Sequence, residues 1–377
     1  MLRFFKSIDP LLYLFPILLW IVSCVVLWSL TYASSEPSVH ILAIKQLVFG
    51  LIGITIMIAM TILDYRMLYG SSWLIGLVTV LLLIAVEFFG QTTLGATRWL
   101  DLKIFNLQPS EVAKLGLVIF LATYLSSHVE KPTIRSFFIV GGALLLPVVL
   151  VLIQPDLGTA LILIVASLGI LIALKLRSIH FFALGIVFLL ALSVSALSYY
   201  KITPFNYLLK DYQRNRITTF INPESDPLGK GYNVRQAMIA VGNGGIYGRG
   251  LGKEVGQLSQ LNFLPKAYTD FIFAALAESA GIIGASIVLL LYGGLFWRIL
   301  STAKNAKDNF AQLISFGYLS STAFAMFINI GMNLGVMPVT GIPLPFISAG
   351  GTALIINFVA IGILQSIYIR RQAIKFD

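Results

Sequence analysis

Long apolar runs alternate with short polar segments along almost the whole chain. A helix needs about 20 predominantly apolar residues to cross the hydrocarbon core of a bilayer. The pattern predicts ten such spans, near residues 11–31, 41–62, 72–88, 111–126, 136–153, 157–174, 180–199, 270–297, 310–333 and 350–369. The sequence therefore predicts an all-α polytopic integral membrane protein in which residues 1–377 form one membrane domain.

The composition supports this fold class. Charged residues make up 11% and hydrophobic residues 58% of the chain, and the mean hydropathy is +0.91. A soluble domain carries about a quarter charged residues, so this chain has too few polar side chains to cover a water-facing surface. One cysteine rules out a cysteine-built metal site, and the three histidines have no helical spacing that would suit zinc. The net charge of +10 is interpreted through its placement, and no nucleic acid partner is expected.

The placement of Lys and Arg predicts the orientation. Thirteen of them fall in the N-terminal segment, the even-numbered loops and the C-terminal segment, whereas the opposite short loops hold only Arg98 and Lys103. Cytoplasmic loops carry the excess of basic residues in membrane proteins. Both termini of this multi-pass protein are therefore expected in the cytoplasm.

One long polar segment, at about residues 200–269, lies between the seventh and eighth predicted spans on the outer side. It carries nine Lys and Arg residues and a glycine-dense stretch at residues 242–252. Loops held by a rigid scaffold often carry the chemistry of a protein. The glycines could present backbone N–H groups to a phosphate, but they match no P-loop and more often indicate tight turns.

Four further motifs are predicted at the outer ends of the spans. They comprise Arg98-Trp99 with residues 108–114, the Gln154-Pro155-Asp156 turn with residues 157–159, the segments 226–232 and 264–274, and the proline- and glycine-rich segment 341–352. The last segment is expected to interrupt the helices and to line a cavity, because irregular backbone at membrane depth is tolerated only there or inside protein.

Together these motifs resemble the SEDS family (shape, elongation, division and sporulation) over nearly the whole chain. The resemblance implies a ten-span peptidoglycan glycosyltransferase of the bacterial cytoplasmic membrane. It would polymerise lipid II, an undecaprenyl-pyrophosphate-linked disaccharide-peptide, beside a class B penicillin-binding protein and other proteins of the elongation complex. Residues 154–156 and 223–229 are typical of the rod-shape branch, whereas residues 250–252 are closer to the division branch.

The sequence departs from the family pattern at three positions. Tyr268 stands where the family usually has His, Ser279 where Glu is usual, and Ala349 where Tyr is usual. These departures put in doubt any mechanism that relies on a histidine next to the catalytic carboxylate.

Asp270 is the candidate catalytic residue. It follows the long polar segment and precedes an apolar run, with Thr269 as a possible helix N-cap. A carboxylate is favoured at a helix N-terminus by about 0.3–1 kcal/mol, which would explain Asp270 without any catalysis. The resemblance instead implies that Asp270 is the general base that accepts a proton from a sugar hydroxyl.

Charged residues at the predicted helix ends have two interpretations each. Glu111 and Lys114 could form an intrahelical ion pair, or could line a substrate cavity with Lys114 near pyrophosphate. Asp156 could cap a helix or belong to the same cavity. Trp99 could be an interfacial aromatic residue or a substrate contact.

The basic residues of the outer side could be solvated or could bind the pyrophosphate leaving group. The candidates for pyrophosphate binding are Arg98, Arg214, Arg216 and Lys230. No cofactor is assigned, and a divalent cation, Mg²⁺ or Mn²⁺, remains an open option. The alternatives to an elongation-type polymerase are a flippase for the same lipid-linked precursor, a division-type paralogue and a catalytically idle scaffold.

Overall fold

The computed structural model describes residues 7–33, 37–93, 96–103, 105–128, 134–174, 211–227, 229–251, 264 and 267–371. Nine of the ten predicted spans are helices, and the seventh, at 180–199, lies outside the described residues. The helices of the bundle are α2 (Pro10–Ala33), α3 (Pro37–Ile62), α4 (Arg66–Phe89), α5 (Pro109–His128), α6 (Ile134–Ile153), α7 (Leu157–Ala173), α11 (Ile272–Lys304), α12 (Asn309–Asn333) and α13 (Gly351–Ile369).

The helices have the length and surface of an integral membrane protein. Among the described residues, seven are long and apolar enough to cross a bilayer, and α6 and α7 are shorter apolar helices. Large apolar side chains point outward from the bundle, for example Trp73 (65% exposed), Phe88 (76%) and Leu290 (74%). Side chains of this size would be buried in a water-soluble protein, whereas lipid can cover them here. The predicted polytopic helical fold class is therefore confirmed.

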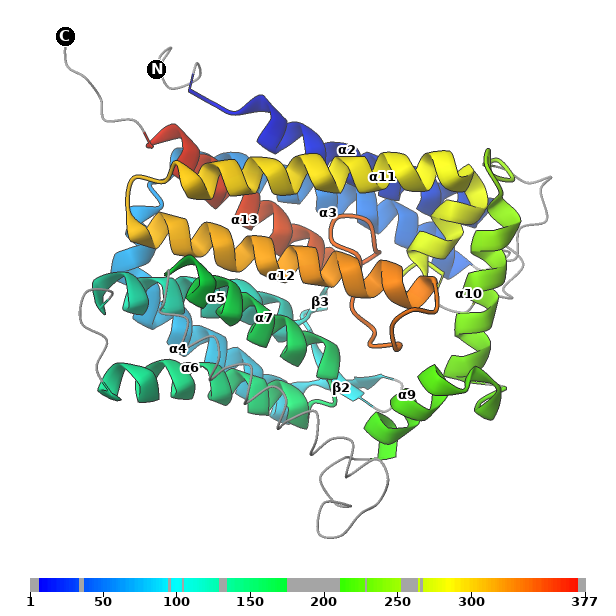
Figure 1. Cartoon of the computed structure of the whole chain (residues 1–377), viewed down its shortest axis with the longest axis horizontal. Coiled ribbons are helices and arrows are strands. Elements are labelled where there is room, and N and C mark those ends of the chain that lie inside the picture. The colour runs from blue at the N-terminus through cyan, green and yellow to red at the C-terminus, as the bar shows by residue number, and fades with distance from the viewer. Residues whose placement is uncertain are drawn as a thin grey trace.

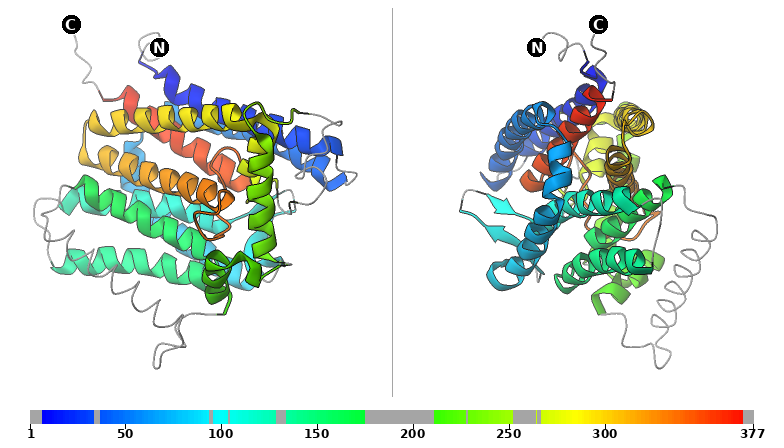
Figure 2. Two further views of the ribbon diagram at one scale, coloured as in Figure 1. Left: turned by 45° about the vertical axis from the view of Figure 1, so that its right-hand side comes forward. Right: turned by 90° about the vertical axis from the view of Figure 1, so that its left-hand side faces the viewer.

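The helix bundle has one end covered by residues of the long polar segment. Figure 1 shows α9 (Asp211–Ile221) and α10 (Lys230–Gly244) at this end, joined by the short 3-10 helix η2 (Pro223–Ser225). The left view in Figure 2 shows α10 running across the end of the bundle, and it packs against α11 and α12.

The glycine-dense stretch after α10 packs against a break in α11. Gly281 lies inside α11 with φ at 65°, a backbone conformation that favours glycine. The Ile282 N–H donates to the Gly245 carbonyl (2.9 Å), and the Gly250 N–H donates to the Ser279 carbonyl (3.0 Å). A Cβ on Gly244 would lie 2.0 Å from a backbone oxygen of α11. Positive φ angles at Gly245 and Gly250 fit the tight turns that the sequence indicates, and the close approach of the two backbones is a second role that the sequence does not indicate.

A small sheet between α4 and α5 was not predicted. It consists of β1 (Gln91–Thr93), β2 (Ala96–Asp101) and β3 (Asn106–Leu107), all antiparallel, in the order β1-β2-β3. Strand β2 carries both Arg98 and Trp99 and thereby fixes where these two side chains emerge.

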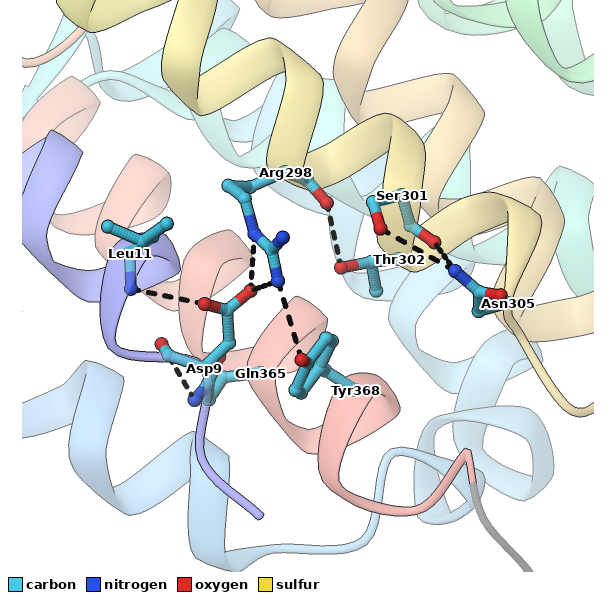
Figure 3. A network of polar contacts seen from close by, with 8 residues as sticks. All are labelled: Asp9, Leu11, Arg298, Ser301, Thr302, Asn305, Gln365 and Tyr368. Carbon is cyan, nitrogen blue, oxygen red and sulfur yellow. Dashed lines mark hydrogen bonds and ion pairs between the residues drawn. The ribbon is translucent and has the colours of Figure 1, made fainter. Parts of the chain in front are cut away.

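The opposite end of the bundle is closed by a polar network (Figure 3). The Arg298 guanidinium of α11 donates to the buried Asp9 carboxylate from Nε (2.7 Å) and also from a terminal nitrogen. The Asp9 carboxylate also accepts the Leu11 N–H at the start of α2 (3.1 Å), and Gln365 of α13 donates to the Asp9 carbonyl (3.2 Å). Three helices far apart in the sequence are thus joined at one point.

Candidate active site

The loop between α12 and α13, residues 334–350, is the centre of the candidate site. It folds back into the bundle, and its side chains Leu344, Phe346 and Ile347 are at most 2% exposed. Buried backbone needs hydrogen-bond partners. The neighbouring helices supply them: for example, the Ser23 hydroxyl of α2 donates to the Ile347 carbonyl (2.5 Å). The prediction that this proline- and glycine-rich segment interrupts the helices and lines a cavity is confirmed.

A first cavity lies between α5, α7, α12, α13 and this loop. Glu111 and Lys114 line it and form an ion pair of 2.7 Å, with Glu111 only 1% exposed. Helix α5 begins at Pro109, so Glu111 is in its first turn, where a carboxylate is favoured. The predicted intrahelical ion pair is confirmed and it lines this cavity, whereas a contact between Lys114 and pyrophosphate stays a prediction.

The polar lining of this first cavity continues on α12 and α13. The Tyr318 hydroxyl donates to the Asn357 side-chain oxygen (2.9 Å), and both residues line the cavity with Ser321 and Thr322. Sequence reasoning missed these four residues. The available signal was the presence of polar side chains within otherwise apolar spans.

Asp270 lies in the turn that precedes α11, beside the α12–α13 loop. The first helical residue is Ile272, and the flanking residue Phe271 makes no side-chain cap, so the predicted N-cap at Thr269 is wrong. A Cβ on Gly341 would lie 3.7 Å from the Asp270 carboxylate oxygen Oδ2. A side chain at position 341 would therefore make an ordinary van der Waals contact with this carboxylate, so the loop runs beside Asp270.

A second cavity lies on the other side of the same loop. Its lining comes from α9, η2, α10 and the first part of the loop, and its two charged lining residues, Arg216 and Lys230, are both basic. Arg216 is 9% exposed and donates from a terminal nitrogen to the Thr340 carbonyl (3.0 Å). The Lys230 backbone N–H donates to the Asp226 carboxylate (2.7 Å), which anchors the start of α10. Arg214 lies on α9 in the same region.

Arg98 and Asp156 form a separate group at the start of α7. Arg98 donates to the Gln154 carbonyl (3.2 Å) and to the Pro155 carbonyl, and its guanidinium lies 4.0 Å from the Asp156 carboxylate. The Asp156 carboxylate caps α7 by accepting the Thr159 N–H (3.2 Å) and hydroxyl (2.9 Å). Neither Arg98 nor Asp156 is among the lining residues of the two cavities.

The first turn of α7 packs against the α12–α13 loop. Gly158 follows Asp156 by two residues, and a Cβ there would lie 2.6 Å from the Ile342 side chain of the α12–α13 loop. Trp99 is half-buried on β2, where its partner across the ladder is Gln91. The structure thus brings Glu111, Lys114, Arg216 and Asp270 to one loop, whereas Arg98 and Asp156 meet at the start of α7, outside the lining of both cavities.

A divalent cation finds no evident ligand set in the part of the chain that the structure describes. No group of three or more His, Cys, Asp and Glu side chains that could hold a metal occurs among those residues. Glu111 already pairs with Lys114, and the Asp226 carboxylate already accepts the Lys230 N–H.

Comparison with known proteins gives the family. A family model for FtsW, RodA and SpoVE, described as "Cell cycle protein", matches residues 10–373. The peptidoglycan glycosyltransferase MrdB of Escherichia coli (strain K12) is 36% identical over 368 residues, which cover 98% of this chain and 95% of that protein.

Solved structures agree with this match. The chain is similar to the rod shape determining protein RodA of Thermus thermophilus, with a TM-score of 0.69 and 25% identity over 97% of this chain and 98% of that one. It is also similar to a chain from a structure that describes coordination of polymerization and crosslinking by a peptidoglycan synthase complex, with a TM-score of 0.77 and 27% identity over 97% and 98% of the two chains. The chain therefore belongs to the SEDS family, the family of FtsW, RodA and SpoVE.

Proposed function

We propose that this protein is a peptidoglycan glycosyltransferase that polymerises lipid II into glycan strands at the outer face of the cytoplasmic membrane, in the elongation branch of the family. The names of its relatives support the activity. The observation that carries the proposal from the structure is the α12–α13 loop, which adjoins the Asp270 carboxylate, the Glu111–Lys114 cavity and the basic second cavity.

In the proposed reaction, Asp270 acts as the general base. Its carboxylate accepts the proton of an acceptor sugar hydroxyl while the hydroxyl oxygen attacks the anomeric carbon of the donor. The bond from that carbon to the pyrophosphate oxygen breaks, and undecaprenyl pyrophosphate leaves with the bonding electron pair. A single displacement inverts the anomeric configuration. General-base catalysis of this kind contributes about 10²–10⁴-fold to the rate.

The basic residues would offset the negative charge that develops on the leaving group. Arg216 and Lys230 are suited to this because they are the charged residues that line the second cavity. Lys114 offers a cation in the first cavity, although its pairing with Glu111 reduces its net effect. Arg214 would add to the field from α9.

The proposed partner is a class B penicillin-binding protein, with other proteins of the elongation complex around it. The similarity to a chain of a peptidoglycan synthase complex supports such a partner. The distribution of Lys and Arg supports the orientation with both termini in the cytoplasm, which places α9, α10 and the candidate site outside.

Lipid II polymerisation by the purified protein tests this function. The protein would be reconstituted with and without a candidate class B penicillin-binding protein, and the glycan products would be separated on a gel. Polymer is expected in the presence of the partner. If no polymer forms under either condition while the protein moves lipid II across vesicle membranes, a flippase would replace the proposal. If neither polymer nor transport is found, a scaffold would replace it.

A further inference from the structure

The backbone that leads into Asp270 is held by hydrogen bonds at three successive carbonyls. The Tyr268 carbonyl accepts the Ala349 N–H (2.9 Å), and the Thr269 carbonyl accepts the Ser348 hydroxyl (2.7 Å). The Asp270 carbonyl accepts from the side-chain amides of both Asn329 and Asn333, each at 3.1 Å. The donors to all three carbonyls come from α12 and the α12–α13 loop.

Asn329 and Asn333 are unusual residues for the inside of an apolar helix. They lie four residues apart on α12, which puts them on one face, and both are 0% exposed. Polar side chains inside a membrane are costly and are commonly retained for a function. Both buried side-chain amides donate to the same carbonyl, that of the candidate catalytic residue, and this convergence needs an explanation.

Asn333 also supplies the missing cap of α11. Its side-chain oxygen accepts the Ala274 N–H (3.0 Å), which belongs to the first turn of α11, where Phe271 provides no side-chain cap. The first N–H groups of a helix have no partner within the helix. Asn333 thus fixes both the Asp270 carbonyl and the first turn that follows it.

Asn329 links the Asp270 carbonyl to the α12–α13 loop. Its side-chain amide donates to the Ile342 carbonyl (2.8 Å) as well as to the Asp270 carbonyl. Ile342 follows Gly341, whose Cα faces the Asp270 carboxylate. The two asparagines therefore set the position of the carboxylate relative to the loop that borders both cavities.

We propose that Asn329 and Asn333 are positioning residues for the glycosyl transfer, acting on Asp270 through its backbone; this rests on the proposed function of Asp270 as the base. The pair touches no reacting atom. It holds the peptide carbonyl of Asp270 and the start of α11 in one place, so that the carboxylate reaches the acceptor hydroxyl. A misplacement of about 1 Å in a catalytic group can cost about 10²-fold in rate.

The test is the steady-state kinetics of lipid II polymerisation by the full-length protein with its partner. The double variant Asn329→Leu/Asn333→Leu keeps side-chain volume but removes every amide contact. Its kcat is expected to fall about 10²-fold with little change in KM, because the cavities that bind substrate remain. The matched control is Gln365→Met, which removes a buried amide that donates to a carbonyl at the other end of the bundle. This control is expected to keep the wild-type kcat.

The single variant Asn329→Leu covers the case in which the double variant does not fold, because it leaves the Asn333 cap of α11 intact. It is expected to show a smaller fall in kcat in the same direction. A folded variant of either kind with the wild-type kcat, or an equal fall for Gln365→Met, would overturn the positioning role. An Asp270→Asn variant measured alongside separates the two proposals. If Asp270→Asn stays active, Asp270 is not the general base. If Asp270→Asn is inactive while the asparagine variants are fully active, only the positioning role is wrong.

Discussion

The ion pair between Glu111 and Lys114 allows the structural and the functional interpretations of the first cavity to be separated. The two charged groups are 2.7 Å apart on one face of α5, and the Glu111 side chain is 1% exposed. Lys114→Met removes the cation and leaves the carboxylate without its partner. Removing one member of a buried pair costs about 3–5 kcal/mol, whereas replacing both by neutral groups is often close to neutral.

A charge-swapped variant gives the sharpest contrast. Glu111→Lys/Lys114→Glu keeps an ion pair on the same face and moves the cation by about one helical turn toward the start of α5. Moving the negative charge away from the first turn costs about 0.3–1 kcal/mol, so the variant should fold. If Lys114 contacts phosphate oxygens, the loss of one charge-assisted hydrogen bond, worth about 1.5–3 kcal/mol, should lower kcat/KM about 10- to 150-fold.

The assay combines thermal unfolding in detergent with lipid II polymerisation. Lys114→Met is expected to unfold at a clearly lower temperature than wild type, and Glu111→Gln/Lys114→Met is expected to recover most of that loss. The swapped variant should unfold near the wild-type temperature and polymerise poorly. A stable swapped variant with the wild-type kcat/KM would refute the substrate contact and leave only an ion pair.

Three further predictions concern stability. Arg298→Met should lower the free energy of unfolding by about 3–5 kcal/mol, because it leaves the buried Asp9 carboxylate without its ion-pair partner. The double variant with Asp9→Asn should recover most of this loss. Equal stability of Arg298→Met and wild type in thermal unfolding would contradict the prediction. Gly244→Ala should lower the unfolding temperature, because its Cβ would meet the backbone of α11 at 2.0 Å, and an unchanged value would show that the two backbones separate easily. Burial and the hydrogen bond to Asp308 raise the pKa of Tyr65 from 10.0 to about 12. The protonated Tyr65 hydroxyl should thus contribute its full stabilisation below pH 10, and this stabilisation should be lost as the pH rises through 12. In unfolding measurements at several pH values, Tyr65→Phe should lose less stability than wild type over this alkaline range.

The spans were predictable because the hydrophobic pattern is a property of local sequence. Runs of apolar residues indicated nine helices that the structure describes, and the three-residue spacing of Glu111 and Lys114 indicated that they share one face of α5. The non-helical segment before α13 was also predictable, because prolines and glycines there leave little chance of a continuous helix.

The tertiary contacts were not predictable in the same way. The sequence makes Arg98 one of several candidates for pyrophosphate binding, and in the structure it donates to the carbonyls of the turn before α7. That contact depends on how the small sheet carries β2 to the start of α7, which no local pattern encodes. The same holds for Asn333 and Ala274, whose hydrogen bond links the last turn of α12 to the first turn of α11 across 59 positions of sequence.

The central claim is that Asp270 is the general base, and the most direct measurement compares wild type with Asp270→Asn in lipid II polymerisation, with the partner present. The substitution keeps the backbone carbonyl that Asn329 and Asn333 hold, so the fold of the site should persist. The account predicts polymer from wild type and a rate at least about 10²-fold lower from a folded Asp270→Asn protein. Equal amounts of polymer from the two proteins would contradict it.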